Sequence, residues 1–181
     1  PRLEDWIEVP SDKVSFDTRP EMKAREVCRL VEDDLAAAAH DFVRVNFANG
    51  DMVGHTGSLQ ASITAMETVD ECIGRLEKAI RQAGGIMLVI ADHGNLDMMF
   101  EVNKKDGTLK LDSAGKPVLK TSHTLSPVPC LIVGVAPGAF ELNPQVKEPG
   151  LGNIASTLLV LLGFAPPAEY LPPLILPSTG V

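Results

Sequence analysis

The sequence predicts an α/β domain built on a mostly parallel sheet, and three observations carry that prediction. An apolar, β-branched run from Ile86 to Ala91 follows Gly84 and Gly85 and is typical of a buried strand. Residues 59–83 place apolar side chains at helical spacing, and residues 42–47 alternate apolar and polar side chains. Strand, helix and strand joined by short links form a βαβ unit, which implies a parallel pair with a right-handed crossover.

The first helix is expected after an irregular stretch that covers residues 1–16. Pro20 suits the first turn of a helix and Thr18 suits its cap, so we expect a helix over Glu21–Ala39. His40 follows at the helix end, where the helix dipole favours a cation. The expected helix over 59–83 presents one apolar face, made of Ile63, Met66, Val69, Ile73, Leu76 and Ile80.

The second half of the chain begins with a break in this pattern. Two turn clusters within residues 98–120 predict a hairpin excursion on the surface. Residues 129–135 predict another buried strand, and residues 153–162 an apolar helix that ends at Gly163. The tail after Ala165 carries five prolines and is expected to be extended.

Composition limits the classes of partner. The chain has 181 residues, 45% of them hydrophobic, and a formal net charge of −8. This charge argues against nucleic acid and anionic membranes, and no run of 18 apolar residues predicts a membrane span. An acidic protein can still hold an anionic substrate when metal ions reverse the local charge. The odd set of Cys28, Cys72 and Cys130 indicates a reducing compartment, so we expect a cytoplasmic protein.

Acidic and imidazole side chains follow the predicted strands. Asp92 and His93 come directly after the strand that ends at Ala91, and Asp51 and His55 lie in the loop before the long helix. Loops at the carboxyl ends of strands carry ligand sites, so these side chains and His123 can converge. Mixed imidazole and carboxylate ligands suit Zn²⁺, Mn²⁺ or Fe²⁺ better than Ca²⁺.

Each of these residues also has a purely structural interpretation. Asp51 can stabilise a turn, and His55 and His123 can be ordinary loop histidines with a hydrogen-bond partner. Lys13 by itself is typical of a solvated surface lysine. Four serines are candidate nucleophiles by residue type: Ser58, Ser62, Ser122 and Ser126. None of them lies in a Gly-x-Ser-x-Gly motif.

Three ordered motifs resemble cofactor-independent, that is 2,3-bisphosphoglycerate-independent, phosphoglycerate mutase. The resemblance runs from about Pro10 to Leu162 and includes the intervening βαβ unit. Its motifs are Asn49–Gly57, Ala91–Asn95, and Ser122–Thr124 with Pro127–Pro129; Pro10–Val14 and Arg19–Met22 also fit.

The resemblance implies a three-layer, alkaline-phosphatase-like fold with helices on both faces of the sheet. In that family an inserted transferase domain splits the phosphatase domain, and this chain resembles the second half of the split domain. Residues 1–19 would enter from the missing transferase domain. Residues 20–181 would form the C-terminal half of the metal-binding domain, with the excursion at 98–120 on its surface. The missing N-terminal part of the same enzyme is then an expected partner.

The resemblance also implies an activity, which is the interconversion of 3-phosphoglycerate and 2-phosphoglycerate in glycolysis and gluconeogenesis. A phosphoserine intermediate and two Mn²⁺ ions would serve it, with Co²⁺, Mg²⁺ or Zn²⁺ as alternative metals. By resemblance, one ion is held by Asp51, His55 and His123, the other in part by Asp92 and His93, and Lys13 contacts the phosphoryl group.

No catalytic residue is expected in this chain, because the family's serine nucleophile lies in the missing N-terminal part. The segment alone is therefore expected to be inactive, and the complete enzyme to be a monomer that acts on a small phosphorylated substrate. Two alternatives stay open. One is another phosphomutase or phosphohydrolase of the same superfamily, and the other is a non-catalytic metal-binding module.

Overall fold

The chain combines four α-helices with two small sheets in the part that its structure, a computed structural model, describes: residues 4–120 and 122–178. The outer ends of the expected 1–19 and 20–181 units, and residue 121, lie outside that part. In chain order the elements are α1 (Ala24–Ala37), α2 (Asn49–Gly54), α3 (Leu59–Gln82), β1 (Met87–Ile90), β2 (Cys130–Val133), β3 (Phe140–Leu142), the 3-10 helix η1 (Leu151–Asn153), α4 (Ile154–Leu161) and β4 (Ile175–Pro177).

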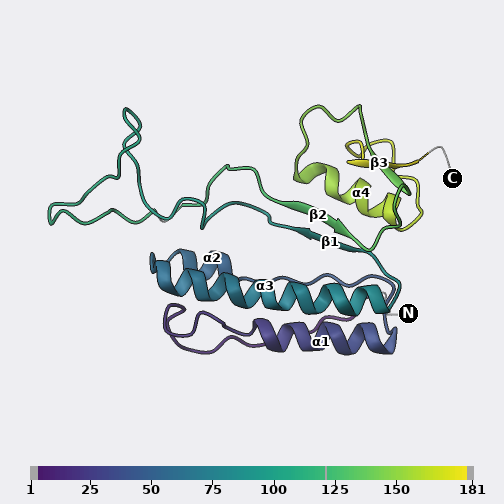
Figure 1. The fold of residues 1–181 in the computed structure, drawn as a ribbon, viewed down its shortest axis with the longest axis horizontal. Coiled ribbons are helices and arrows are strands. Elements are labelled where there is room, and N and C mark those ends of the chain that lie inside the picture. Colours follow the sequence, from purple (N-terminus) through teal and green to yellow (C-terminus); the bar gives the residue numbers. More distant parts are fainter. Residues whose placement is uncertain (1–3, 121, 179–181) are drawn as a thin grey trace.

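Helices α1 and α3 pack side by side and carry the main core (Figure 1). Cys28 and Cys72 are completely buried between them, beside Ala24 and Leu76. Burial raises the pKa of the Cys28 thiol to about 12, so this cysteine behaves as a small hydrophobic side chain. Helix α3 begins at Ser58, whose hydroxyl accepts a hydrogen bond from the backbone nitrogen of Ala61 at 3.3 Å.

The parallel strand pair predicted from the sequence is wrong for the described residues. Strand β1 pairs with β2 in antiparallel register, from Met87 opposite Val133 to Ile90 opposite Cys130. Residues 42–47 form no strand in the described chain. Alternation predicts that a segment is extended, but its partner is chosen by non-local contacts that a local pattern does not contain.

The α/β class is confirmed, and helices lie on both sides of the β1–β2 pair: α3 on one side and α4 on the other (Figure 1). The prediction that these strands are buried is wrong for this chain. Ile90 is 39% exposed and Leu131 is 56% exposed. The described residues place too few side chains over the pair to remove it from water.

Residues 98–120 form a double hairpin that projects away from the helices (Figure 1). Isolated bridges join Phe100 to Leu119, Val102 to Leu109, and Leu111 to Pro117. Met99 at its base is buried. The excursion is thus anchored at its base, while its two turns project into solvent.

Four short elements were not predicted: α2, β3, η1 and β4. Helix α2 lies inside the stretch expected to be a loop, and its six residues are too few for a periodic signal. The proline-rich tail, expected to be extended, turns at residues 168–170 and then forms β4, which pairs antiparallel with β3. The described residues contain no helix with the length and apolar character that crossing a bilayer requires.

Candidate metal centre

Helix α2 sets the spacing of the first two candidate ligands. Asp51 lies in its first turn and His55 caps its C-terminal end, so they are four residues apart on one face. The Asp51 Oδ1 and His55 Nε2 atoms are 3.1 Å apart. One turn of helix therefore brings an oxygen and a nitrogen together.

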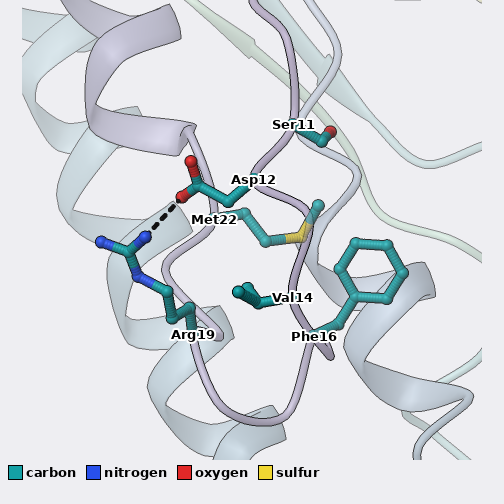
Figure 2. A pocket seen from close by; sticks show the side chains of 6 residues that line it. All are labelled: Ser11, Asp12, Val14, Phe16, Arg19 and Met22. Carbon is teal, nitrogen blue, oxygen red and sulfur yellow. Dashed lines mark hydrogen bonds and ion pairs between the residues drawn. The ribbon is translucent and has the colours of Figure 1, made fainter.

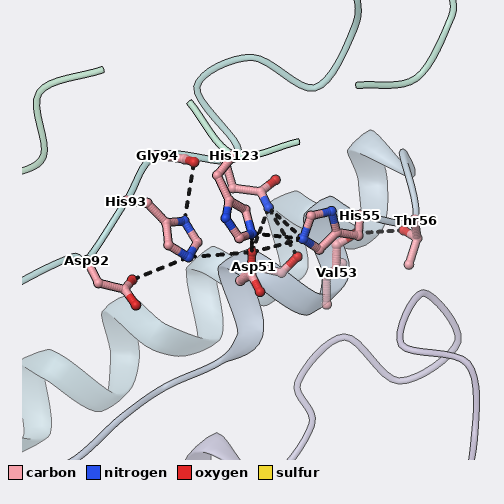
Figure 3. Close-up of polar contacts among 9 residues, drawn as sticks. Asp51, Val53, His55, Thr56, Asp92, His93, Gly94 and His123 are labelled. Atoms are coloured by element: carbon pink, nitrogen blue, oxygen red, sulfur yellow. Dashed lines mark hydrogen bonds and ion pairs between the residues drawn. The ribbon is translucent and has the colours of Figure 1, made fainter. Parts of the chain in front are cut away.

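His123 joins this pair from a distant part of the chain (Figure 3). Its Nε2 lies 3.0 Å from Asp51 Oδ1 and 3.3 Å from His55 Nε2. One donor atom from each residue lies within 4.8 Å of the other two. The structure thus brings together the three side chains expected to share an ion.

The donor set fits a divalent cation. An ion about 2.0–2.2 Å from each ligand, in tetrahedral or octahedral coordination, requires donor atoms about 3.0–3.5 Å apart. The three observed separations, 3.0, 3.1 and 3.3 Å, fall in that range. The Asp51 and His55 side chains are each 33% exposed and His123 is 47% exposed, so an ion can reach them from solvent.

His93 and Asp92 lie beside this triangle (Figure 3). The rings of His93 and His123 stack with centroids 3.6 Å apart, and His93 Nε2 is 4.0 Å from Asp51 Oδ1. The Nδ1 atom of His93 is 3.3 Å from the carbonyl oxygen of Gly94. A proton on Nδ1 can bond that carbonyl and leave Nε2 as a metal acceptor.

Asp92 supplies the second donor of this neighbouring pair. Its Oδ1 lies 3.6 Å from His93 Nε2, and its side chain is 88% exposed. A carboxylate this open has no structural partner in the described chain apart from the imidazole, and its oxygens remain available to a cation. All five candidate ligands therefore lie in one region of the surface.

Asn95 supports Asp51, a role that the sequence analysis did not assign to it. The Asn95 side-chain nitrogen donates to Asp51 Oδ1 at 2.8 Å. Burial by itself raises the pKa of Asp51, but this hydrogen bond and the imidazoles of His55, His123 and His93 outweigh it, so the pKa is lowered. Asp51 is consequently held as a carboxylate, the form that binds metal. Asn95 follows the ligand pair in sequence, which is the signal that could have indicated it.

Lys13 is exposed in the loop before α1. The neighbouring Asp12 pairs with Arg19 at 2.9 Å and with Lys23 at 3.0 Å, which closes the loop before α1 (Figure 2). The cavity inside this loop, about 10 Å³, has room for one water molecule at most. Lys13 is not among the residues that line this cavity.

Comparison with known proteins identifies the family. A family model described as Metalloenzyme superfamily matches residues 2–166. The chain belongs to this superfamily. The alkaline-phosphatase-like fold class expected from the resemblance is thereby confirmed. Membership also agrees with a surface that gathers one carboxylate and two imidazoles.

Two similar curated proteins carry the same enzyme name. A Leptospira interrogans protein named "Probable 2,3-bisphosphoglycerate-independent phosphoglycerate mutase" is 45% identical over 172 residues. The 2,3-bisphosphoglycerate-independent phosphoglycerate mutase of Trypanosoma brucei brucei is 40% identical over 173 residues. Each alignment covers 95% of this chain but 31% of the relative, and falls in a C-terminal part of it. The chain thus spans about a third of the length of these relatives.

A solved structure agrees with the sequence comparison. Leishmania mexicana phosphoglycerate mutase, studied at low cobalt concentration, matches with a TM-score of 0.89 and 41% identity. The match covers 95% of this chain and 31% of that one. This metalloenzyme chain therefore has the fold of one part of that mutase.

Proposed function

We propose that this chain is the metal-binding part of a 2,3-bisphosphoglycerate-independent phosphoglycerate mutase, an isomerase that interconverts 3-phosphoglycerate and 2-phosphoglycerate in glycolysis and gluconeogenesis. The observation that carries the proposal is the triangle of Asp51, His55 and His123 donor atoms in a chain whose relatives bear that name. Because the chain spans about 31% of those relatives, the phosphoserine step and turnover belong to residues outside it.

In this proposal Asp51, His55 and His123 hold one divalent ion, and Asp92 and His93 supply part of the coordination of a second. We favour Mn²⁺ for both ions. Co²⁺ is an alternative, since the related Leishmania mexicana structure was studied at low cobalt concentration. Two such ions supply charge neutralisation to a transferring phosphoryl group and lower the pKa of its nucleophile.

The chain's own residues present donor atoms in the required protonation state. Asn95 keeps Asp51 ionised by donating to Oδ1, and the Gly94 carbonyl sets the tautomer of His93. We assign the phosphoryl contact to Lys13, whose ammonium group is exposed and can reach an anion. A net charge of −8 makes such local positive groups necessary for holding an anionic substrate.

We further propose that the remaining part of the same polypeptide covers the exposed apolar surface. A groove of about 260 Å³ lies beside α4. It is lined by apolar and aromatic side chains: Phe42, Ala155, Leu158, Leu159, Leu162 and Tyr170. In this arrangement residues 1–19 enter from a transferase domain, and residues 20–181 complete the phosphatase domain. The complete enzyme would then be a cytoplasmic monomer.

The experiment measures Mn²⁺ and Co²⁺ binding and mutase activity of a full-length chain that contains these residues. We expect conversion of 3-phosphoglycerate with metal and without 2,3-bisphosphoglycerate. At a metal concentration of about 100 Kd, binding should stabilise the folded state by about 2.7 kcal/mol. Asp51→Asn should weaken metal binding, whereas Asp112→Asn, in the distant double hairpin, should not.

The outcomes separate the alternatives. Absence of conversion with bound metal would overturn the mutase assignment. Net release of inorganic phosphate would replace it with a phosphohydrolase of the same superfamily. Metal binding without any reaction would leave a metal-binding module.

A further inference from the structure

A cluster of three polar side chains joins the loop that carries His93 to the loop that carries His123. The Thr124 hydroxyl lies 3.0 Å from Asp97 Oδ1 and 2.9 Å from Oδ2, and the Ser126 hydroxyl donates to Oδ2 at 2.6 Å. Thr124 directly follows His123, and Asp97 lies four residues after His93. The Asp97 carboxylate therefore connects the His123 loop to the segment that follows His93.

The backbone strengthens the same connection. The Thr124 nitrogen donates to the Gly94 carbonyl at 2.9 Å, which makes an isolated antiparallel bridge between the two loops. A Cβ atom at Gly94 would clash with the Thr124 hydroxyl and crowd the Asp97 carboxylate. The approach of the loops thus depends on a glycine at this point.

His123 needs such a connection more than its partners do. Asp51 and His55 are placed relative to each other by the turns of α2, whereas residues 122–128 form no helix or strand. His123 is also the most exposed of the three, at 47%. Its position therefore depends on what holds its loop.

We propose that Asp97 is a positioning residue, which holds His123 against Asp51 and His55 through the hydroxyl groups of Thr124 and Ser126. The inference rests on the proposed metal centre. Both carboxylate oxygens of Asp97 are engaged by the hydroxyl groups of Thr124 and Ser126, so we assign it to act through His123 and not as a ligand. Partners of this kind, outside the ligand sphere, typically change metal affinity about 10- to 100-fold when removed.

The test measures Co²⁺ affinity and the visible absorption of bound Co²⁺ in the full-length protein. Asp97→Ala should weaken binding about 10- to 100-fold and change the spectrum. Asp97→Asn keeps an acceptor oxygen and should restore part of the loss. The matched control is Asp106→Ala: Asp106 is also exposed and accepts from a threonine hydroxyl, that of Thr108 at 2.8 Å, but it lies in the double hairpin. This control should leave Co²⁺ binding unchanged.

A double-mutant cycle with His123→Ala isolates the route of the effect. If Asp97 acts through His123, Asp97→Ala should cause no further loss of affinity once His123 is absent. An equal loss in both backgrounds would overturn the inference, as would wild-type affinity in the single Asp97→Ala variant. Should that variant fail to fold, the double variant Thr124→Val with Ser126→Ala removes the same side-chain hydrogen bonds to Asp97 and must give the same pattern.

The cycle also distinguishes failure of the inference from failure of the metal centre. A wild-type protein that binds no Co²⁺, or whose His123→Ala variant binds it as tightly as wild type, would overturn the metal centre and the inference together. Tight wild-type binding that depends on His123 but not on Asp97 would overturn the inference alone.

Discussion

At the scale of single residues, Asp51 is the point on which the candidate centre converges. Its Oδ1 atom lies 3.1 Å from His55, 3.0 Å from His123 and 4.0 Å from His93. One carboxylate close to three imidazoles is the arrangement expected where side chains gather to bind cations. It also means that small displacements of Asp51 change all three distances at once.

Gly54 affects the position of Asp51 indirectly, because it packs closely against the side chain of Asn95, which donates a hydrogen bond to Asp51. A Cβ atom at Gly54 would clash with Asn95 Oδ1 and crowd Leu96. We therefore predict that Gly54→Ala moves Asn95 and weakens Mn²⁺ binding about 10-fold or more, the size of effect seen when partners outside the ligand sphere are lost. Titration of the protein with Mn²⁺ would measure the loss.

The matched control is Gly74→Ala, since Gly74 lies in α3 with nothing within 4 Å of an added Cβ. There the gain in helix propensity should raise the free energy of unfolding by about 0.5–1 kcal/mol and leave Mn²⁺ affinity unchanged. Equal Mn²⁺ affinity in both variants would show that Asn95 does not support the centre.

The sequence indicated which candidate side chains gather in space but not which residues support them. Asp51, His55, Asp92, His93 and His123 were all expected near one edge, since loops after strands carry such groups, and they lie together. The supporting contacts of Asn95 and Asp97 depend on how two loops approach each other in space. No spacing along the chain encodes that approach.

At the scale of elements, the C-terminal end of α1 carries a pH-sensitive contact. The helix ends at Ala37, and the His40 ring contacts Asp34 at 2.6 Å and Asp5 at 3.3 Å. Hydrogen bonds to Asp34 and then to Asp5 raise the pKa of His40. Specific carboxylates therefore explain this histidine, in addition to the helix dipole that the sequence suggested.

A raised folded-state pKa means that protonated His40 stabilises the fold at low pH. The contribution is fully present below the ordinary imidazole pKa of about 6.5 and is lost as pH rises through the raised value. We predict that His40→Gln destabilises the protein more at about pH 5.5 than at about pH 8.5, on either side of that ordinary value. Chemical denaturation at both pH values would measure the difference.

The control for this prediction lies on the same helix. Arg29 pairs with Asp33 at 3.1 Å on the exposed face of α1, in an ion pair that contains no histidine. Arg29→Gln should therefore have the same small effect at both pH values. If the loss of stability in His40→Gln is the same at both pH values, the protonated His40 does not stabilise the end of α1 through Asp34 and Asp5.

Local pattern predicted the long elements well and their pairing poorly. Helix α3 was expected over 59–83 and spans Leu59–Gln82, because its apolar period is long and its cap is strong. Its apolar face was only partly correct: Val69 and Leu76 are buried, whereas Ile63 and Met66 are exposed. Burial depends on neighbours, and the described chain provides α1 and α2 as neighbours of α3 but little over those two residues.

At the scale of the whole molecule, apolar surface is left uncovered around the sheet. The β1–β2 pair has only two strands, and each strand has a partner on only one side in the described residues. Exposed strand edges and exposed apolar patches are sites where further structure binds. This agrees with a chain that spans about a third of its relatives.

Two leucines with nearly equal exposure in this chain make the proposal of a covering part testable. Leu131, on β2, is 56% exposed, and Leu109, in the double hairpin, is 49% exposed. If the remaining part of the polypeptide covers the sheet, Leu131 becomes a core residue in the full-length protein while Leu109 stays in solvent. Leu131→Thr should then cost about 2–3 kcal/mol of unfolding free energy, and Leu109→Thr no more than about 0.5 kcal/mol. Denaturant unfolding of both full-length variants would measure these costs, and equally small values would show that the sheet faces water in the complete enzyme as it does here.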